Sequence, residues 1–393
     1  MRPHGSWIGL WLAFAAVLPA QAPRDWPALV RGFDAYAASD SIVGASILVL
    51  RDGRILVHHE YGFADRTHGI GTGPATIYHW ASITKTLTAV AILQLRDRGL
   101  LSLDDPVTRW VPELRAVHDS FGPVDAITIR MLLGHSGGFQ GPTWPYTEGR
   151  PWEPFEPMRW EQLVAMMPYQ EVQFRPDSRY GYSNPGFIYL ARIIEAISGD
   201  PWQGYIYKNV WGPLGLSHSY FAGTPSWLAV DRSNNYYLVR DSVTGTMTVQ
   251  DNGRDFDPGI TIPNGGWNAP LGDVAIWLRF LTGVTPGDSI VLRRASLEEM
   301  WRSRFPVPGP DAGPDSIGLS FFVLHRAQRR FVGHTGSQAG FRSFFYLDPE
   351  TRTAVIAAFN TSNEVTPERS AAGFNAVRDA ALAMLAGGNP DRD

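Results

Sequence analysis

The chain has 393 residues, 44% of them hydrophobic, so it can bury a large core in one big domain or in two or three ordinary ones. Its formal net charge is -4, and it contains no Lys/Arg block, no zinc-ligand spacing and no interleaving of basic with aromatic residues. These features exclude the common nucleic-acid-binding classes, so no nucleic acid is expected among the partners. The chain has no cysteine, which excludes disulfides, thiolate metal sites and a Cys nucleophile.

The first 22 residues have the pattern of a secretory signal peptide. Arg2 provides a basic start, an apolar run extends from Trp7 to about Leu18, and Ala20-Gln21-Ala22 is a small-residue end suited to cleavage. The apolar run is shorter than the roughly 20 residues of a spanning helix, and no later segment qualifies. We therefore expect an exported protein, periplasmic or extracellular, with no transmembrane segment after cleavage.

The mature chain opens with a predicted hairpin followed by a helix. Ile42–Leu50 and Ile55–Tyr61 are rich in β-branched residues, and Asp52-Gly53 between them is a strong hairpin signal. From Ile83 to Leu95 the apolar residues recur with helical spacing, and Gly99 is a plausible C-terminal stop.

The rest of the chain completes one α+β unit that is split in sequence by an insertion. Residues 106–263 are rich in Pro, Gly and aromatics and predict a mostly helical lobe. Strand-like runs then return, and a final amphipathic helix is expected over about 371–385. The fold class is α+β: an antiparallel sheet flanked by helices, built from about 23–105 and 264–386. The returning strands are predicted at Phe321–Leu324, Phe341–Leu347 and Thr353–Phe359.

Lysine usage points to a candidate base. Of the 34 basic residues only Lys85 and Lys208 are Lys. Arg cannot lose its proton at usable pH, whereas a buried Lys can have its pKa lowered enough to act as a base. Ser82 precedes Lys85 by three positions, which on a helix puts both side chains on one face within hydrogen-bond reach. The alternative is that Ser82 caps the helix and Lys85 is a solvated first-turn residue.

Two further segments carry polar groups suited to acyl transfer. Tyr182-Ser183-Asn184 precedes an apolar helix and offers a phenol, a hydroxyl and an amide, although a turn with a helix cap would explain it equally well. Gly333-His334-Thr335-Gly336-Ser337 precedes a strand-like run, and its small residues would let a substrate backbone pair along the strand.

Together these motifs resemble the serine β-lactamase and penicillin-binding-protein superfamily, in its class C β-lactamase, D,D-peptidase and esterase branch. The resemblance rests on three motifs, which occur in this order: Ser-x-x-Lys at Ser82, Tyr-Ser-Asn at Tyr182 and the His-Thr-Gly triplet at His334. The similarity covers roughly 43–361 and includes the run Ile127–Gly138. The resemblance implies a β-lactamase/transpeptidase-like fold and a serine hydrolase. No metal or cofactor is expected, because the chain has no His-x-x-x-His pair and the neighbours His58 and His59 would point to opposite faces of their strand.

The resemblance also implies a role for each matching residue. Ser82 would be acylated, Lys85 and Tyr182 would share the acid–base work, and Asn184 would hold the substrate amide. The backbone N–H groups of Ser82 and Ser337 would form the oxyanion hole.

The last triplet bears on the substrate. His334, Thr335 and Gly336 would face it together with Ser337, but typical class C β-lactamases have Lys where this chain has His334. A permanent cation for a substrate carboxylate is then missing unless His334 is protonated. This favours a D,D-peptidase-like or esterase-like activity on a peptide, amide or ester over β-lactam hydrolysis. A sensor that is acylated without turnover is a further alternative.

A second serine lies in a sequence motif that carries the nucleophile in another class of hydrolases. Gly134-His135-Ser136-Gly137-Gly138 matches the Gly-x-Ser-x-Gly elbow of α/β-hydrolases, which would make Ser136 the nucleophile. That elbow must be followed by a helix, yet Pro142 and Pro145 come next. We therefore expect Ser136 to be structural.

Overall fold

The computed structural model describes residues 22–139, 157–284, 290–309 and 313–387. The predicted signal peptide lies outside the described residues except for Ala22. In the part that is described, no helix is both long and apolar enough to span a bilayer.

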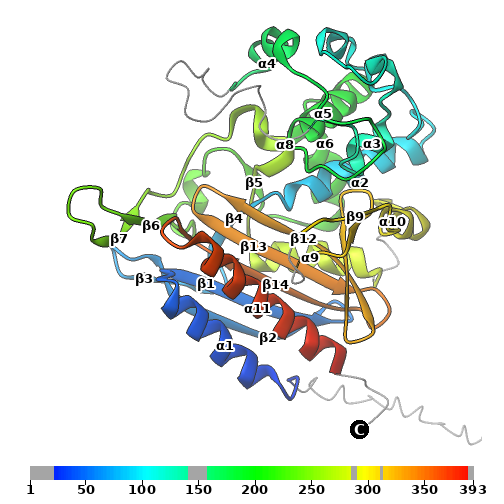
Figure 1. The fold of residues 1–393 in the computed structure, drawn as a ribbon. Helices are drawn as coiled ribbons and strands as arrows, with labels where there is room; N and C mark the ends of the chain where they lie inside the picture. The colour runs from blue at the N-terminus through cyan, green and yellow to red at the C-terminus, as the bar shows by residue number, and fades with distance from the viewer. Residues whose placement is uncertain (1–21, 140–156, 285–289, 310–312, 388–393) are drawn as a thin grey trace, which may run out of the picture.

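A nine-stranded antiparallel sheet is the centre of the fold, with strand order β3-β2-β1-β14-β13-β12-β11-β10-β9 (Figure 1). The first and last parts of the chain meet in it, because β1 pairs with both β2 and β14. The strands are β1 Gly44–Arg51, β2 Arg54–Asp65, β3 Ile70–Gly71, β9 Phe305–Pro306, β10 Ser316–Ile317, β11 Phe322–Arg326, β12 Arg329–Gln338, β13 Phe341–Asp348 and β14 Thr353–Phe359.

The predicted β1–β2 hairpin is confirmed. Asp52 and Gly53 both have positive φ, +48° and +71°, which is the conformation that a two-residue hairpin turn of the favoured twist requires. The predicted strands at 341–347 and 353–359 are also confirmed, and Asp348 turns the chain between them by accepting the N–H groups of Glu350 and Thr351.

Helices cover both faces of the sheet. α1 (Trp26–Ser39) and α11 (Pro367–Gly387) lie side by side on one face (Figure 1), and α2 (Thr84–Asp97), α9 (Leu271–Thr282) and α10 (Arg294–Met300) belong to the other side. The alternation along β1 explains this arrangement, because Ile47 and Val49 pack in the core under α1 and α11, whereas Leu48 and Leu50 join the core around α2.

The remaining helices gather beyond one end of the sheet, in the upper part of Figure 1. Their apolar sides merge with α2 and α9 into one core, which places the start of α2 at the junction between sheet and helices. These helices are α3 Ile129–Leu133, α4 Trp160–Met166, α5 Pro185–Ser198, α6 Trp202–Ile206, α7 Gly212–Leu214 and α8 Ile262–Gly265.

Six of the strands that were not expected from the sequence lie outside the main sheet. They form two three-stranded sheets, β4-β8-β5 and β15-β6-β7. β6 pairs with β15, so residues from the middle of the chain attach beside the end of the main sheet. These strands have only two to five residues, too few for a clear alternation. Their bounds are β4 Ile77–Ala81, β5 Tyr220–Phe221, β6 Tyr236–Arg240, β7 Met247–Asp251, β8 Trp267–Pro270 and β15 Thr361–Asn363.

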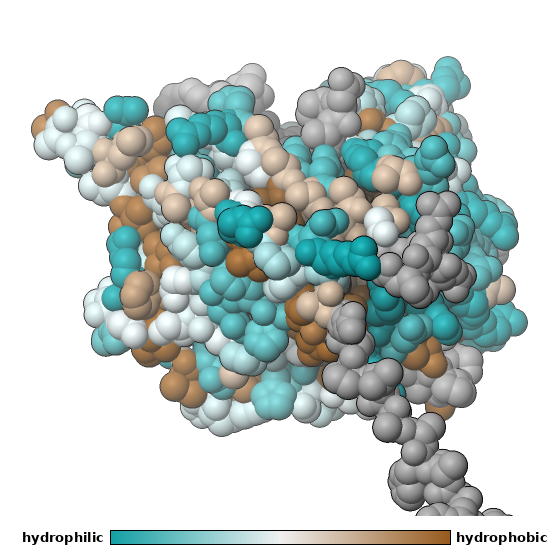
Figure 2. Space-filling view, turned by 90° about the horizontal axis from the view of Figure 1, so that it is seen from below, coloured by the Kyte–Doolittle hydropathy of each residue, from teal (hydrophilic) through white to brown (hydrophobic). Residues whose placement is uncertain are grey.

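The surface carries no dominant apolar face in the view from below. In Figure 2 the hydrophobic residues form separate patches between hydrophilic ones. A groove of about 700 Å³ between α1 and α11 is lined mainly by small and apolar residues.

Candidate active site

Ser82 lies at the turn from β4 into α2. Ala81, the last residue of β4, has φ +48°, a left-handed conformation that is rare for a residue with a side chain. The Ser82 carbonyl accepts the Lys85 N–H at 3.0 Å, so the first helical turn starts directly at the serine. The sharp turn brings the Ser82 side chain to the wall of a cavity.

Lys85 is fully buried one turn further along α2. Its Nζ lies 3.1 Å from Ser82 Oγ and 2.8 Å from the backbone oxygen of Asn264. Burial lowers the pKa of Lys85 well below its usual value, and none of its named contacts is a carboxylate that would favour the charged form. The geometry places an amine with a lowered pKa beside the hydroxyl of Ser82.

Tyr182 contributes a phenol to the same point. It precedes α5, its hydroxyl hydrogen-bonds to Ser82, and its ring centroid lies 5.0 Å from Lys85 Nζ. Burial raises the pKa of Tyr182 above its usual value of 10.0, so the phenol keeps its proton at neutral pH. Ser82 and Lys85 of the first motif and Tyr182 of the second are thus brought together.

His135 packs against the ring of Tyr182, a contact that was not predicted from the sequence. The two rings stack with centroids 4.6 Å apart, and His135 Nδ1 accepts the backbone N–H of Ser183 at 2.9 Å. An acceptor at Nδ1 requires a neutral ring, and burial lowers the pKa of His135 well below 6.5. His135 therefore fixes the turn that carries the phenol.

Asn184 sits at the N-terminal end of α5 and lines the cavity. Its Oδ1 is buried and has no hydrogen-bond partner among the described residues. Asn264, in α8, reaches the Asn184 backbone oxygen with Nδ2 at 3.4 Å while its own backbone oxygen holds Lys85. The side chain of Asn184 is thus left available to a ligand.

The segment from His334 to Ser337 forms a free strand edge beside Ser82. β12 pairs with β13 along this whole segment, but its pairing with β11 ends at Gly333, opposite Phe322. On that side the edge beyond Gly333 has no partner strand within the described residues. An extended substrate segment would find unpaired backbone groups there.

Gly336 allows this edge to approach Ser82 closely. A Cβ atom at this position would lie 2.3 Å from the backbone oxygen of Trp80 and 3.2 Å from Ala81 Cβ. Both neighbours belong to β4, the strand that leads into Ser82. Only glycine therefore permits β12 to cross β4 at this distance.

His334 is neutral in this environment. It is buried, its ring lies 4.9 Å from that of Phe322, and its Nδ1 is 2.5 Å from the backbone oxygen of Thr335. Burial, aided by nearby Lys85, lowers the pKa of His334 to about 3. His334 therefore does not supply the positive charge that Lys provides in typical class C β-lactamases.

These residues share one open cavity of about 540 Å³. It extends from Ser82 across β12 to the N-terminal end of α11. The residues that line it are Ser82, Tyr182, Asn184, Phe322, His334, Thr335, Gly336, Ser337, Arg342, Ser362, Asn363, Glu364, Pro367, Ser370 and Phe374.

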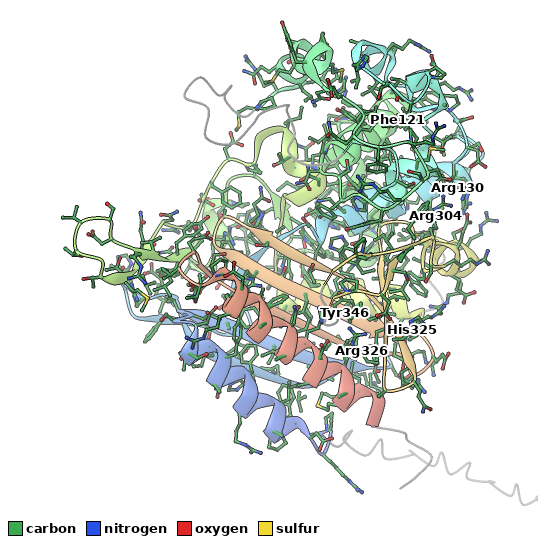
Figure 3. The ribbon with its side chains drawn as sticks, in the orientation of Figure 1. Phe121, Arg130, Arg304, His325, Arg326 and Tyr346 are labelled. Atoms are coloured by element: carbon green, nitrogen blue, oxygen red, sulfur yellow. The ribbon has the colours of Figure 1, made fainter. Side chains whose placement is uncertain are left out.

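Ser136 has the contacts of a structural residue. It is completely buried, it does not line this cavity, and its Oγ donates to Asp177 at 3.0 Å. Asp177 also accepts from Arg304, which is labelled in Figure 3, at 3.1 Å. The hydroxyl thus faces a carboxylate that is also engaged with an arginine, and its hydrogen-bond partners among the described residues include no lysine or histidine.

Comparison with known proteins identifies the family of this chain. The family described as Beta-lactamase matches residues 29–380. Protein flp of Staphylococcus aureus strain MW2 is 25% identical over 336 residues, covering 83% of this chain and 61% of that protein. The chain therefore spans less than two thirds of the length of this relative.

Solved structures share the fold. The octameric penicillin-binding protein homologue of Pyrococcus abyssi superposes with a TM-score of 0.76 at 27% identity, covering 94% of this chain and 79% of that one. D-amino acid amidase of Ochrobactrum anthropi SV3 has a TM-score of 0.74 at 21% identity, covering 91% and 98%. A class C β-lactamase has a TM-score of 0.73 at 17% identity, covering 92% and 97%. The predicted fold is confirmed, and the chain belongs to the β-lactamase family of serine hydrolases.

Proposed function

We propose that this protein hydrolyses a peptide, amide or ester through an acyl-enzyme on Ser82, with a D,D-peptidase-like or esterase-like specificity. The observation that most directly supports this proposal is the contact of 3.1 Å between Ser82 Oγ and the Nζ of the fully buried Lys85. A buried lysine whose pKa is lowered is suited to remove the proton of a neighbouring hydroxyl.

The acylation step follows from the protonation states. Lys85 takes the proton of Ser82 Oγ as the oxygen attacks the substrate carbonyl, and the N–H groups of Ser82 and Ser337 receive the developing oxyanion. Tyr182 gives its phenol proton to the leaving nitrogen or oxygen as the acyl bond breaks, and the proton on Lys85 then restores Tyr182. The side chain of Asn184 would form a hydrogen bond with an amide of the acyl group, as acceptor or as donor.

Hydrolysis then regenerates the serine. Water attacks the Ser82 ester, its proton passes to the Lys85–Tyr182 pair, and the carboxylic acid leaves as Ser82 regains its proton. This deacylation step distinguishes an enzyme, which turns over, from a sensor, which remains acylated.

The neutral state of His334 supports a peptidase or esterase over a β-lactamase, because the cation that typical class C enzymes place at this position is absent. Among proteins of the same fold, one is named a D-amino acid amidase and one a β-lactamase/D-alanine carboxypeptidase. D-amino-acyl amides, D-alanyl peptides and aryl esters are therefore the substrates to compare.

The test uses wild type, Ser82→Ala and Ser136→Ala with p-nitrophenyl acetate, a D-alanyl peptide, a D-amino-acid amide and nitrocefin. We expect turnover that depends on Ser82 and not on Ser136, fastest on one of the first three substrates. Fastest turnover of nitrocefin would instead indicate a β-lactamase. A stoichiometric adduct without turnover, seen by intact mass, would indicate a sensor.

We also propose that the protein is exported, on the basis of the signal-peptide pattern of residues 1–22. The mass of the protein recovered from the periplasm or the medium should correspond to a chain that starts at Pro23. A full-length mass in the cell body alone would contradict export.

A further inference from the structure

His79 links the two backbone segments that carry the proposed oxyanion hole. It lies on β4, three residues before Ser82, and its side chain is 1% exposed. Gln338 is the last residue of β12 and directly follows Ser337. His79 Nε2 lies 3.1 Å from Gln338 Oε1. A side-chain hydrogen bond therefore joins the strand that leads into Ser82 to the strand end that carries the N–H group of Ser337.

The other ring nitrogen of His79 is held from the opposite side. Nδ1 lies 2.9 Å from Oδ1 of Asn268, its direct partner on the neighbouring strand β8. Asn268 is buried, and its Nδ2 donates to the backbone oxygen of Gly266 at 3.3 Å. The imidazole is thus fixed between two amides, one on β8 and one on β12, so the position of β12 is tied to the β4–β8 pair.

The ring of His79 is neutral and closely packed. Burial, with a further contribution from the nearby Arg232, lowers the pKa of His79 to about 4. The ring meets Phe256 edge-on with centroids 4.8 Å apart, and the ring of Phe341, the cross-strand partner of Gln338, lies 6.0 Å away. A neutral imidazole carries one N–H, so it donates to one amide and accepts from the other. Both bonds then form without a charge on the ring.

The side chain of Gln338 has little room to move away from His79. A Cβ atom added at Gly265 would lie 2.5 Å from Gln338 Oε1, so the amide packs directly against the backbone at this glycine. Gly265 follows Asn264, whose backbone oxygen accepts a hydrogen bond from Lys85 Nζ. The amide of Gln338 therefore lies between β4 and the end of α8, next to the residue that holds the candidate base.

The bond between His79 and Gln338 limits how far β12 and β4 can separate. Gly336 sets the smallest distance between the two strands, because an added Cβ there would lie 2.3 Å from the Trp80 backbone oxygen. Ser343 of β13 donates to the same oxygen at 3.3 Å, at the crossing itself. The His79–Gln338 bond holds the strands together two residues further along β12, beyond the crossing.

We propose that His79 and Gln338 are positioning residues that set the distance between the two N–H groups of the oxyanion hole, those of Ser82 and Ser337. Neither is among the described residues that line the cavity, so both act through the backbone rather than by touching the substrate. This inference rests on the proposed function and deepens it. As Ser82 Oγ attacks, the carbonyl π electrons move onto the oxygen, and two N–H donors at a fixed separation receive that charge.

The experiment compares p-nitrophenyl acetate with its thionoester, in which sulfur replaces the carbonyl oxygen. In both, Ser82 Oγ bonds to the acyl carbon, the bond to the phenol oxygen breaks, and p-nitrophenol leaves with a proton. Sulfur is larger than oxygen and accepts hydrogen bonds weakly, so an oxyanion hole built for oxygen favours the ester. The ratio of the two kcat/KM values therefore reports the fit of the hole, which a general loss of stability does not change.

The variants remove the bond from either end. Gln338→Met removes the amide and keeps the length of the side chain, whereas His79→Phe keeps a flat ring and loses both bonds. Tyr78→Phe is the matched control, because Tyr78 is the neighbouring residue on β4 and is also fully buried. Its hydroxyl hydrogen-bonds to Ser46 of β1 at 2.8 Å and not to β12.

We expect Gln338→Met and His79→Phe each to lower kcat/KM for the ester by roughly 10- to 100-fold and for the thionoester by less than about 3-fold, since a misplacement of about 1 Å costs on the order of 100-fold. The double variant should lose no more than the more affected single variant, because both changes remove the same bond. Tyr78→Phe should leave the ratio unchanged. Equal loss on both substrates, no loss on the ester, or an altered ratio in Tyr78→Phe would overturn the positioning role.

Failure of the proposed function would look different. If Ser82→Ala released p-nitrophenol from both substrates as fast as wild type, the acyl-enzyme itself would be refuted, and the positioning role with it. If Ser82 were required but Gln338→Met kept the wild-type ratio of ester to thionoester, the positioning role alone would fail. Melting temperatures identify a variant that does not fold. Gln338 is only partly buried, so Gln338→Met should melt close to wild type and decides the question by itself if His79→Phe does not fold.

Discussion

Replacing Gly336 with Ala should disable the active site by moving one strand. The added Cβ would lie 2.3 Å from the Trp80 carbonyl oxygen and 2.6 Å from Ser343 Oγ, whereas real Cβ atoms essentially never come within 3.0 Å of another heavy atom. The Ser343 side chain can rotate away, but the Trp80 oxygen belongs to the backbone of β4. β12 and β4 must therefore separate by at least about 0.7 Å.

This displacement acts on the reacting geometry itself. Ser82 follows β4, and Ser337 follows Gly336, so the shift widens the gap between the two N–H groups proposed to hold the oxyanion. A misplacement of about 1 Å costs on the order of 100-fold in rate, and overpacking of this kind costs about 1–3 kcal/mol of stability. We expect Gly336→Ala to lose about two orders of magnitude in kcat/KM with a moderate fall in melting temperature.

The assay is hydrolysis of p-nitrophenyl acetate, with melting temperature measured in parallel. Gly272→Ala is the matched control, since a Cβ there would meet nothing within 4 Å and the residue lies in the first turn of α9. It should keep full activity and equal or slightly higher stability. The reasoning would be refuted if Gly336→Ala stayed within about 3-fold of wild type.

Three further changes follow from the same structure. Lys85→Arg should reduce turnover on the order of 1,000-fold or more at every pH, because the guanidinium keeps its proton; substantial activity at high pH would contradict Lys85 as the base. Ser136→Ala should lose one hydrogen bond, about 1–2 kcal/mol in a denaturant titration, and keep its kcat/KM; a dead enzyme that melts normally would reverse this assignment. Unfolding should become easier as pH falls from about 6.5 toward 4, because His334 and His79 are neutral in the fold, with pKa lowered by burial to about 3 and about 4, and take up protons on unfolding. Each contributes at most about 1.4 kcal/mol per pH unit, and a flat profile of stability against pH would exclude the neutral buried state.

The sequence predicted those parts of the fold that carry a strong periodic signal. The β1–β2 hairpin, the helix after Ser82 and the long C-terminal helix all have long apolar patterns or a turn with one favoured conformation. The short strands β5 and β6 were missed, since they pair with the distant strands β8 and β15, and β7 was missed together with its neighbour β6. Pairing over such sequence separation leaves little trace in local propensity.

The candidate site divides in the same way. Ser82 and Lys85 are one helical turn apart, so spacing alone placed them together, whereas bringing Tyr182 and His334 to the same point required the resemblance to a known family. Asn264 escaped notice because it contributes a backbone oxygen, which any residue type supplies. His135 was noticed only as the neighbour of a rejected nucleophile.

The two lysines of this chain occupy opposite environments, since Lys85 is fully buried whereas the side chain of Lys208 is 69% exposed and paired with Asp200. Lysine-selective isotope labelling of the full chain would therefore give only two side-chain signals in a nuclear magnetic resonance spectrum. The signal that titrates far below the usual range would belong to Lys85, with no assignment experiment needed. The scarcity of lysine thus makes the protonation state of the proposed base directly observable, before and after an inhibitor occupies Ser82.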